Sequence, residues 1–189
     1  MSLIPLGFWA ASAGGGAGAG SFDLLASEIL TGSQVSVTFS SLGDYAADYQ
    51  HLQIRLSARG IWGGGNTGGN IKVTLNGQST TYKNHFLRGN GTDVSSGNST
   101  NVLLNRLALS SNSTDHSPMV IDILDAFNGS KNTTMRSIGG MAFSFGNWIE
   151  LASGAWFDTT PVSSITLANP DGSFAGLSRF SLYGTRKAA

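Results

Sequence analysis

The amino-acid sequence predicts an all-β protein, folded as a sandwich or barrel of antiparallel strands. Three observations favour this class. Short segments that alternate apolar and polar residues recur about every 8–12 residues, clusters of Gly, Asn, Asp and Ser separate them, and no stretch carries a sustained apolar repeat at helical spacing. The composition does not change between about residue 21 and the end of the 189-residue chain, so we expect one domain there.

The first strand candidates lie in the N-terminal half of the chain. Gln34–Phe39 and Tyr49–Arg59 alternate apolar with polar residues, which places the two sets on opposite faces of a sheet. Ile71–Leu75 alternates in the same way and runs into Asn76-Gly77, a dipeptide that favours a two-residue hairpin turn. We therefore expect Thr81–Leu87 to return as the partner strand of this hairpin.

The second half of the chain continues the pattern. Val102–Leu109 is apolar enough to form a buried strand, and Met119–Phe127 ends at the turn residues Asn128-Gly129. The remaining strand candidates are Thr134–Phe145, Trp148–Phe157, Ser164–Leu167 and Arg179–Tyr183. Outside the strands, Asp44–Tyr49 fits one short helical turn, and the glycine-rich stretch Gly89–Ser99 fits a surface loop.

The first 20 residues differ in composition from the rest of the chain. An apolar stretch, Leu3–Ala11, is interrupted by Pro5 and Gly7 and is followed by a Gly- and Ala-rich run that ends at Gly20. No Lys or Arg precedes the apolar stretch, which disfavours a secretory signal, and no run approaches the ~20 apolar residues of a membrane-spanning helix. We interpret residues 1–20 as an apolar anchor on a flexible tether.

This interpretation assigns partner binding to five large apolar side chains. They are Leu3, Ile4, Leu6, Phe8 and Trp9. One use of such a segment is insertion into a groove of a partner or into a subunit interface; packing against the chain's own domain is the alternative, and the sequence leaves both open. Burial against a neighbour contributes about 1.5–3 kcal/mol per large side chain, before the cost of ordering the tether.

The composition limits the classes of function. The chain carries 11 basic and 11 acidic residues, and its 12% of charged residues is about half the usual share. Nucleic-acid binding is disfavoured because phosphate recognition needs a basic surplus. The absence of cysteine excludes disulfides and cysteine-ligated metals. The low charge instead favours a surface that meets other subunits, most simply in a homotrimer.

No group of residues forms a recognisable catalytic motif. The histidines His51, His85 and His116 lack the spacing of a local metal site, and His51 falls among the polar residues of its strand, as a surface side chain does. A glycosidase needs two carboxylates across a cleft; the acidic candidates are Asp122, Asp125, Glu150 and Asp158. The chain has no Gly-x-Ser-x-Gly elbow and no phosphate-binding loop in its required context. We therefore expect no enzyme, no cofactor and no metal.

Aromatic residues raise one binding alternative. Trp62 and Asn66 lie in the glycine-rich stretch Trp62–Gly69, which we expect to be a surface loop. An exposed tryptophan ring beside amide side chains can stack on a sugar ring, so this loop is the candidate site of a glycan-binding module. We interpret Trp148 and Trp156 as core or interface residues.

Several segments resemble small structural proteins of tailed bacteriophages. Tyr49–Arg59, which reads YQHLQIRLSAR, is similar to a YKHLQIR-like strand common in these proteins. Further similar segments follow in the same order: Asn84–Gly91, Val120–Asp125, Arg136–Gly140, Gly154–Phe157, Ile165–Leu167 and Phe180–Gly184. The opening Ile4–Ser12 also resembles the start of such virion proteins. Together the segments span nearly the whole chain.

The resemblance implies a jelly-roll-like β-sandwich and a non-enzymatic role in the virion, with no catalytic residues to carry over. We expect residues 21–189 to form the sandwich, displayed on the particle surface as a capsid decoration or as a tail fibre or tail tip component. We expect residues 1–20 to anchor it to other virion proteins of the capsid or tail. A glycan-binding receptor module of a phage tail is the alternative, and neither interpretation involves nucleic acid or a membrane.

Overall fold

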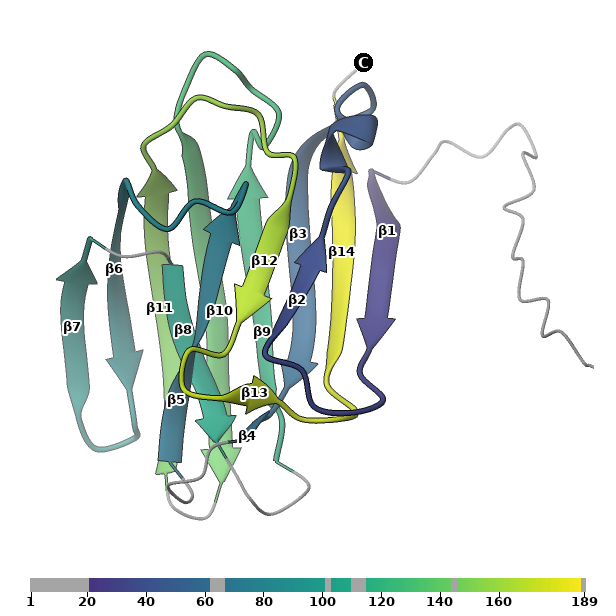
Figure 1. Cartoon of the computed structure of the whole chain (residues 1–189). Helices are drawn as coiled ribbons and strands as arrows, with labels where there is room; N and C mark the ends of the chain where they lie inside the picture. Colours follow the sequence, from purple (N-terminus) through teal and green to yellow (C-terminus); the bar gives the residue numbers. More distant parts are fainter. Residues whose placement is uncertain (1–20, 62–66, 101–102, 110–114, 144–145, 188–189) are drawn as a thin grey trace, which may run out of the picture.

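The computed structural model describes residues 21–61, 67–100, 103–109, 115–143 and 146–187, which form an all-β structure (Figure 1). Within these ranges the chain forms fourteen strands and one short 3-10 helix, η1. The elements are β1 (Phe22–Ile29), β2 (Ser36–Phe39), η1 (Leu42–Tyr45), β3 (Tyr49–Ala58), β4 (Gly60–Ile61), β5 (Thr67–Leu75), β6 (Tyr82–Gly89), β7 (Val94–Ser99), β8 (Leu103–Leu109), β9 (Ser117–Leu124), β10 (Thr133–Phe143), β11 (Gly146–Trp156), β12 (Ile165–Ala168), β13 (Ser173–Phe174) and β14 (Arg179–Arg186). None of the helical structure in these ranges has the length and apolarity needed to cross a bilayer.

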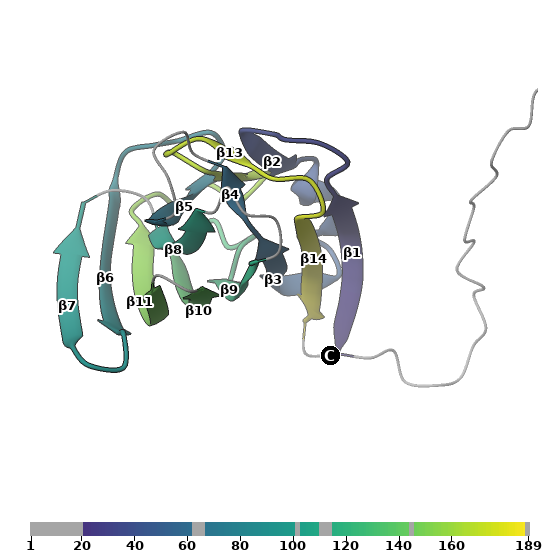
Figure 2. The same cartoon turned by 90° about the horizontal axis from the view of Figure 1, so that it is seen from below.

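The strands form two sheets that pack face to face as a sandwich. The large sheet has eight strands in the order β1-β14-β3-β9-β10-β11-β6-β7, and the small sheet has six in the order β13-β4-β8-β5-β12-β2. Figure 2 shows the small sheet over the middle of the large one, with β6 and β7 at one side and β1 at the other. The pairing of β4 with β8 is parallel, whereas the pairs of the large sheet are antiparallel.

Eight of the strands pair in the nested order of a jelly roll. β1 pairs with β14, β2 with β12, β3 with β9 and β5 with β8, so the first strand of the set joins the last, the second joins the seventh, and so on inward. This pairing places β1, β14, β3 and β9 in one sheet and β2, β12, β5 and β8 in the other. Two sheets connected in this way form a jelly roll. The predicted all-β sandwich is confirmed.

Two hairpins extend the large sheet beyond the jelly roll. β6 and β7 follow β5 in the chain, β10 and β11 follow β9, and both hairpins join the large sheet on the far side of β9. The hairpins are themselves joined by the pairing of β11 with β6. These four strands make up half of the large sheet and lie toward the left of Figure 1.

Alternation along the strands supplies the apolar core between the sheets. In β3, for example, Leu52, Ile54 and Leu56 are buried, and the residues between them face the outer side of the large sheet. The largest fully buried side chains come from both sheets and their connections: Trp156, Phe174, Phe180, Leu30, Leu42, Leu52, Ile54, Ile71, Leu75, Leu107 and Ile121. Burial of apolar area is the dominant favourable term that holds the two sheets together.

The hairpin predicted at Asn76-Gly77 is correct in its turn and wrong in its partner strand. Both residues have positive φ, 52° and 70°, as a two-residue hairpin turn requires, and Leu75 bridges Gln78 across it. The next strand, β6, does not return along β5 but crosses to the large sheet, where it pairs with β11 and β7. The Tyr82 hydroxyl at the start of β6 accepts a hydrogen bond from the Leu75 amide at 2.9 Å, which fixes the crossing.

The edge strands of the large sheet differ most from the expectations. The surface loop expected at Gly89–Ser99 is wrong, because Val94–Ser99 forms β7 and pairs along its length with β6. β7 reads VSSGNS and β1 reads FDLLASEI, and neither shows the clean apolar alternation that predicts a strand. The short helical turn expected at Asp44–Tyr49 occurs slightly earlier, as η1.

A tyrosine packs over a glycine where β3 meets β14. Tyr49 is buried against Gly184, and a Cβ built on Gly184 would lie 2.7 Å from Tyr49 Cγ. The Tyr49 hydroxyl donates a hydrogen bond to the Asp23 carboxylate at 3.0 Å, and Arg186 Nε reaches the same carboxylate at 2.8 Å. The missing side chain at position 184 therefore lets one ring connect β1, β14 and β3.

We predict that Gly184→Ala destabilises the fold. The added methyl group overlaps the Tyr49 ring and displaces it, at a cost of about 1–3 kcal/mol of unfolding free energy. Urea unfolding followed by circular dichroism measures the loss. Gly129→Ala is the matched control, because the nearest atom to a Cβ there lies 3.9 Å away. An equal loss of stability in both variants would contradict the packing role of position 184.

Candidate functional site

The outer face of the two added hairpins is apolar. Five large apolar side chains there point away from the core, and each exposes between 50% and 76% of its surface. They are Leu87 of β6, Val94 of β7, Ile138 of β10, and Ile149 and Leu151 of β11. These five residues are called the hairpin face below. They occupy four neighbouring strands, and all four belong to the added hairpins.

Strand register sets the side chains of the hairpin face side by side. Ile138 lies opposite Leu151, and Leu151 lies opposite Leu87, which makes an apolar row across three strands. In the next row, Ile149 lies opposite Gly89. Directly opposed residues of paired strands have Cβ atoms about 4.5–5.5 Å apart, so the members of a row are in contact.

Shallow hollows run across the hairpin face. One, of about 290 Å³, is lined by the five residues of the hairpin face together with Arg88 and Gly89. A second, of about 470 Å³, lies over β9, β10 and β11, and its lining includes Pro118, Val120 and Trp148. Both hollows share Ile138 and Ile149, so together they form one apolar groove that crosses the strands.

At several positions of β11 and β6 the polarity is inverted relative to an ordinary sheet surface. Ile149 and Leu151 face outward, whereas Glu150 between them points into the molecule and is only 4% exposed. In β6, Asn84 is buried and Leu87 is exposed. Water alone favours the opposite arrangement, because a buried carboxylate loses its hydration and exposed apolar area is unfavourable. An exposed apolar patch of this kind is typical of a binding surface.

Arg88 supports the hairpin face from the inner side of the sheet. Its guanidinium carbon lies 4.8 Å from the centre of the Phe86 ring and 5.2 Å from that of Trp148, and its Nε donates a hydrogen bond to Ser95 Oγ at 2.9 Å. The Phe86 ring also packs closely over Gly97 of β7, where the Cβ of any other residue would clash with it. These contacts link β6, β7 and β11 and so hold together three of the strands that carry the hairpin face.

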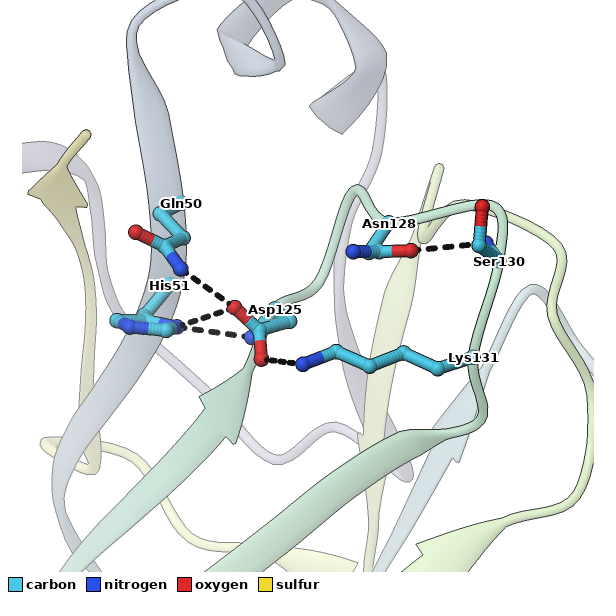
Figure 3. Close-up of polar contacts among 6 residues, drawn as sticks. All are labelled: Gln50, His51, Asp125, Asn128, Ser130 and Lys131. Atoms are coloured by element: carbon cyan, nitrogen blue, oxygen red, sulfur yellow. Dashed lines mark hydrogen bonds and ion pairs between the residues drawn. The ribbon is translucent and has the colours of Figure 1, made fainter. Parts of the chain in front are cut away.

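A second, polar cluster joins the start of β3 to the loop after β9 (Figure 3). The Asp125 carboxylate accepts a hydrogen bond from Gln50 Nε2 at 2.7 Å and forms an ion pair with Lys131. The Asp125 amide donates to His51 Nδ1 at 2.8 Å, and Asn128 Oδ1 accepts from the Ser130 amide at 2.8 Å. A hollow of about 400 Å³ beside this cluster is lined by Tyr49, Gln50, Asp125, Phe127, Asn128 and Lys187.

The contacts of Asp125 make it a structural group. Its φ of 51° is left-handed, a conformation that Asp tolerates better than most residues. Hydrogen bonds from Lys131 and then Gln50 hold the pKa of its carboxyl below the ordinary value of 3.8. His51, expected as a plain surface residue, is half-buried and accepts a hydrogen bond in this cluster. Both carboxylate oxygens are engaged, so we interpret the cluster as a link between β3 and the loop.

We predict that Asp125→Asn removes a pH-dependent part of the stability. Because the pKa of Asp125 is lower in the folded than in the unfolded chain, its contribution is complete well above pH 3.8 and is lost as the pH falls through the folded-state pKa. Urea unfolding at about pH 6 and about pH 3 measures the effect, and the difference between wild type and variant should shrink at the lower pH. Asp44→Asn, at an exposed carboxylate of η1, is the control. A difference that is the same at both pH values would contradict the assignment.

The residues that the sequence predicts to bind partners lie outside the described part of the chain. These residues are the anchor positions Leu3, Ile4, Leu6, Phe8 and Trp9 and the glycan candidates Trp62 and Asn66. Their roles therefore stay predictions. Of the other two tryptophans considered, Trp156 is buried in the core and stacks on Tyr82 with ring centres 6.2 Å apart, and Trp148 is half-buried beside Arg88.

The carboxylates considered for glycoside hydrolysis are distributed over different parts of the molecule. Asp122 lies on the outer face of β9, where Arg136 Nε donates to it at 2.7 Å, whereas Glu150 points to the opposite side of the same sheet. Asp125 and Asp158 lie in separate loops, after β9 and after β11. Among the residues that the structure describes, no three or more His, Cys, Asp or Glu side chains are grouped so that they could hold a metal ion.

The hairpin face is not predicted from the sequence, although the sequence of β11 carries a signal for it. Alternation assigns Ile149 and Leu151 to one side and Trp148 and Trp156 to the other, so both sides of the strand hold large apolar residues. Large apolar residues on both sides are typical of strands that are covered on both faces. Glu150, between the two exposed residues, obscures this signal. A glutamate in a strand normally indicates the solvent-facing side, and here it lies on the buried side.

The fold and the hairpin face define a jelly-roll protein whose large sheet is extended by two hairpins with an apolar outer surface. Comparisons with protein-family models, with curated proteins and with solved structures return no match to this chain.

Proposed function

We propose that the protein is a non-enzymatic structural protein of a bacteriophage virion, displayed on the particle surface as a capsid decoration or as a tail fibre or tail tip component. The observation that carries the structural role is the hairpin face. An exposed apolar groove on added strands is the kind of surface that a neighbouring chain covers in an assembly. The virion setting rests on the resemblance of Tyr49–Arg59 and the segments after it to phage structural proteins.

The residues around the hairpin face support a contact surface. The outer row next to the apolar row is polar: Arg136 lies opposite Ser153, and Ser153 lies opposite His85. On the other side of Arg136 lies Asp122, its hydrogen-bonding partner. An apolar centre with a polar rim is the usual anatomy of a protein interface.

Residues 1–20 supply a second attachment in this proposal. They hold the subunit to a neighbouring capsid or tail protein through the five anchor side chains. Two linked contacts per subunit, repeated over many copies, convert modest affinities into durable attachment. The low charge of the chain favours homo-oligomers, most simply trimers, and β1 and β7 are the large-sheet edges at which copies can meet.

We predict that Ile138→Ser combined with Leu151→Ser weakens the attachment at the hairpin face at least about tenfold and so lowers the number of copies per purified particle. Each large apolar side chain contributes about 1.5–3 kcal/mol when buried, and about 1.4 kcal/mol is a factor of ten in affinity. Quantitative mass spectrometry of purified particles measures the copy number. Both side chains are half-exposed, so circular dichroism and urea unfolding should show a folded variant.

The matched control is Val35→Ser combined with Leu177→Ser, two exposed apolar residues outside the hairpin face. The control should load normally. A normal copy number for the hairpin-face variant would overturn the role of the face, and absence of the wild-type protein from purified particles would overturn the virion proposal.

A further inference from the structure

The size of the hairpin face indicates what covers it. Its five side chains expose roughly 500 Å² in total, at the upper end of what monomers leave uncovered. A standard protein–protein interface takes about 800 Å² from each partner, so these five side chains alone present less area than a globular partner buries. A short apolar peptide is an occupant that matches such a groove.

The chain itself contains such a peptide. Residues 3–9 read LIPLGFW and hold five large apolar side chains and no charged one. The five residues of the hairpin face are likewise uncharged. Peptide and groove are therefore matched in chemistry, and each would otherwise expose apolar area to water.

The tether is long enough for the peptide to reach the face of its own molecule. The described chain begins at Ser21, just before β1, and β10 and β11 lie four and five strands further across the sheet (Figure 1). At about 4.8 Å per strand, and with Ile138 offset from the level of Phe22 by about four residues, the path is about 25–30 Å.

The tether, Ala10–Gly20, has 11 residues rich in Gly and Ala. Such a segment spans about 36–40 Å when fully extended, and about 18 Å on average as a flexible coil. The path therefore lies within its reach and requires only moderate stretching. A short flexible linker also presents the peptide at an effective concentration in the millimolar range, so a weak intrinsic affinity is sufficient.

We propose that, in the isolated protein, residues 3–9 dock on the hairpin face of the same molecule. The docked peptide covers the apolar groove and hides its own anchor side chains until another surface replaces it. This inference concerns the isolated chain and does not depend on the virion role.

The absence of cysteine allows a direct test by NMR. Ser2→Cys creates a single attachment site for a spin label in the full-length chain. The methyl signals of Ile138, Ile149 and Leu151 should lose most of their intensity when the label is oxidised and recover it when the label is reduced. Leu24 lies on β1, beside the point where the tether joins the fold. An undocked segment would broaden the Leu24 methyl signals more than those of the hairpin face. Docking requires stronger broadening at the hairpin face than at Leu24.

A mixed sample separates docking within one molecule from exchange between copies. In it, spin-labelled protein without isotope labels is added to isotope-labelled protein without a spin label. The proposal requires the face signals to stay sharp in this mixture. Broadening in the mixture would overturn the proposal in favour of a second copy as occupant, and broadening only at Leu24 in the first experiment would overturn it in favour of an undocked segment.

Substitutions on both partners complete the test. Phe8→Ser combined with Trp9→Ser should restore the intensity of the face signals, and Ile138→Ser combined with Leu151→Ser should restore the signal of Ile149. Leu177→Ser, at an exposed apolar residue outside the hairpin face, should leave the broadening unchanged. Broadening that survives both double substitutions would contradict docking through apolar contacts.

Discussion

Every strand of the large sheet has two faces, and the small sheet packs against only one side of that sheet. Because side chains alternate between the faces, each strand must place one set of residues in the core and the other set outside it. Strands β3 and β9 solve this in the ordinary way: Ile54 and Ile121 point inward, and Arg55 and Asp122 point outward. The two added hairpins differ, because they also carry large apolar residues on the outer face.

The hairpins keep apolar residues on both of their faces. Trp156 and Ala152 fill the inner side of β11, while Ile149 and Leu151 occupy the outer side. The inner side also holds Glu150, which is only 4% exposed. Exposed apolar area on the outer side is unfavourable in water. We propose that a contact over the hairpin face, from the chain itself or from a neighbour, accounts for this arrangement.

The fold class follows from local patterns because the core strands are regular. Leu52, Ile54 and Leu56 alternate cleanly, so β3 is predicted almost to its bounds. The connections are less predictable: the turn at Asn76-Gly77 is set by local backbone conformation, whereas the sheet that β6 joins depends on contacts with β11, which is distant in sequence. Edge strand β7 lacks an apolar pattern because its pairing with β6, not its own burial, makes it a strand.

The candidate site was less accessible from sequence than the fold. Alternation shows that Ile149 and Leu151 share a face, but not whether a sheet covers that face. The inward position of Glu150 reverses the simplest assignment. The nested pairing of the jelly roll must be known before β6, β7, β10 and β11 stand out as additions whose outer surface lacks a partner sheet.

Electron cryo-microscopy of virions that contain this protein, as we propose, tests the central claim most directly, because it shows whether another polypeptide lies against the hairpin face. We expect ordered density from another polypeptide, in contact with Ile138, Leu151 and Leu87. A particle in which this protein is present and the outer surface of β6, β10 and β11 is open to solvent would contradict it.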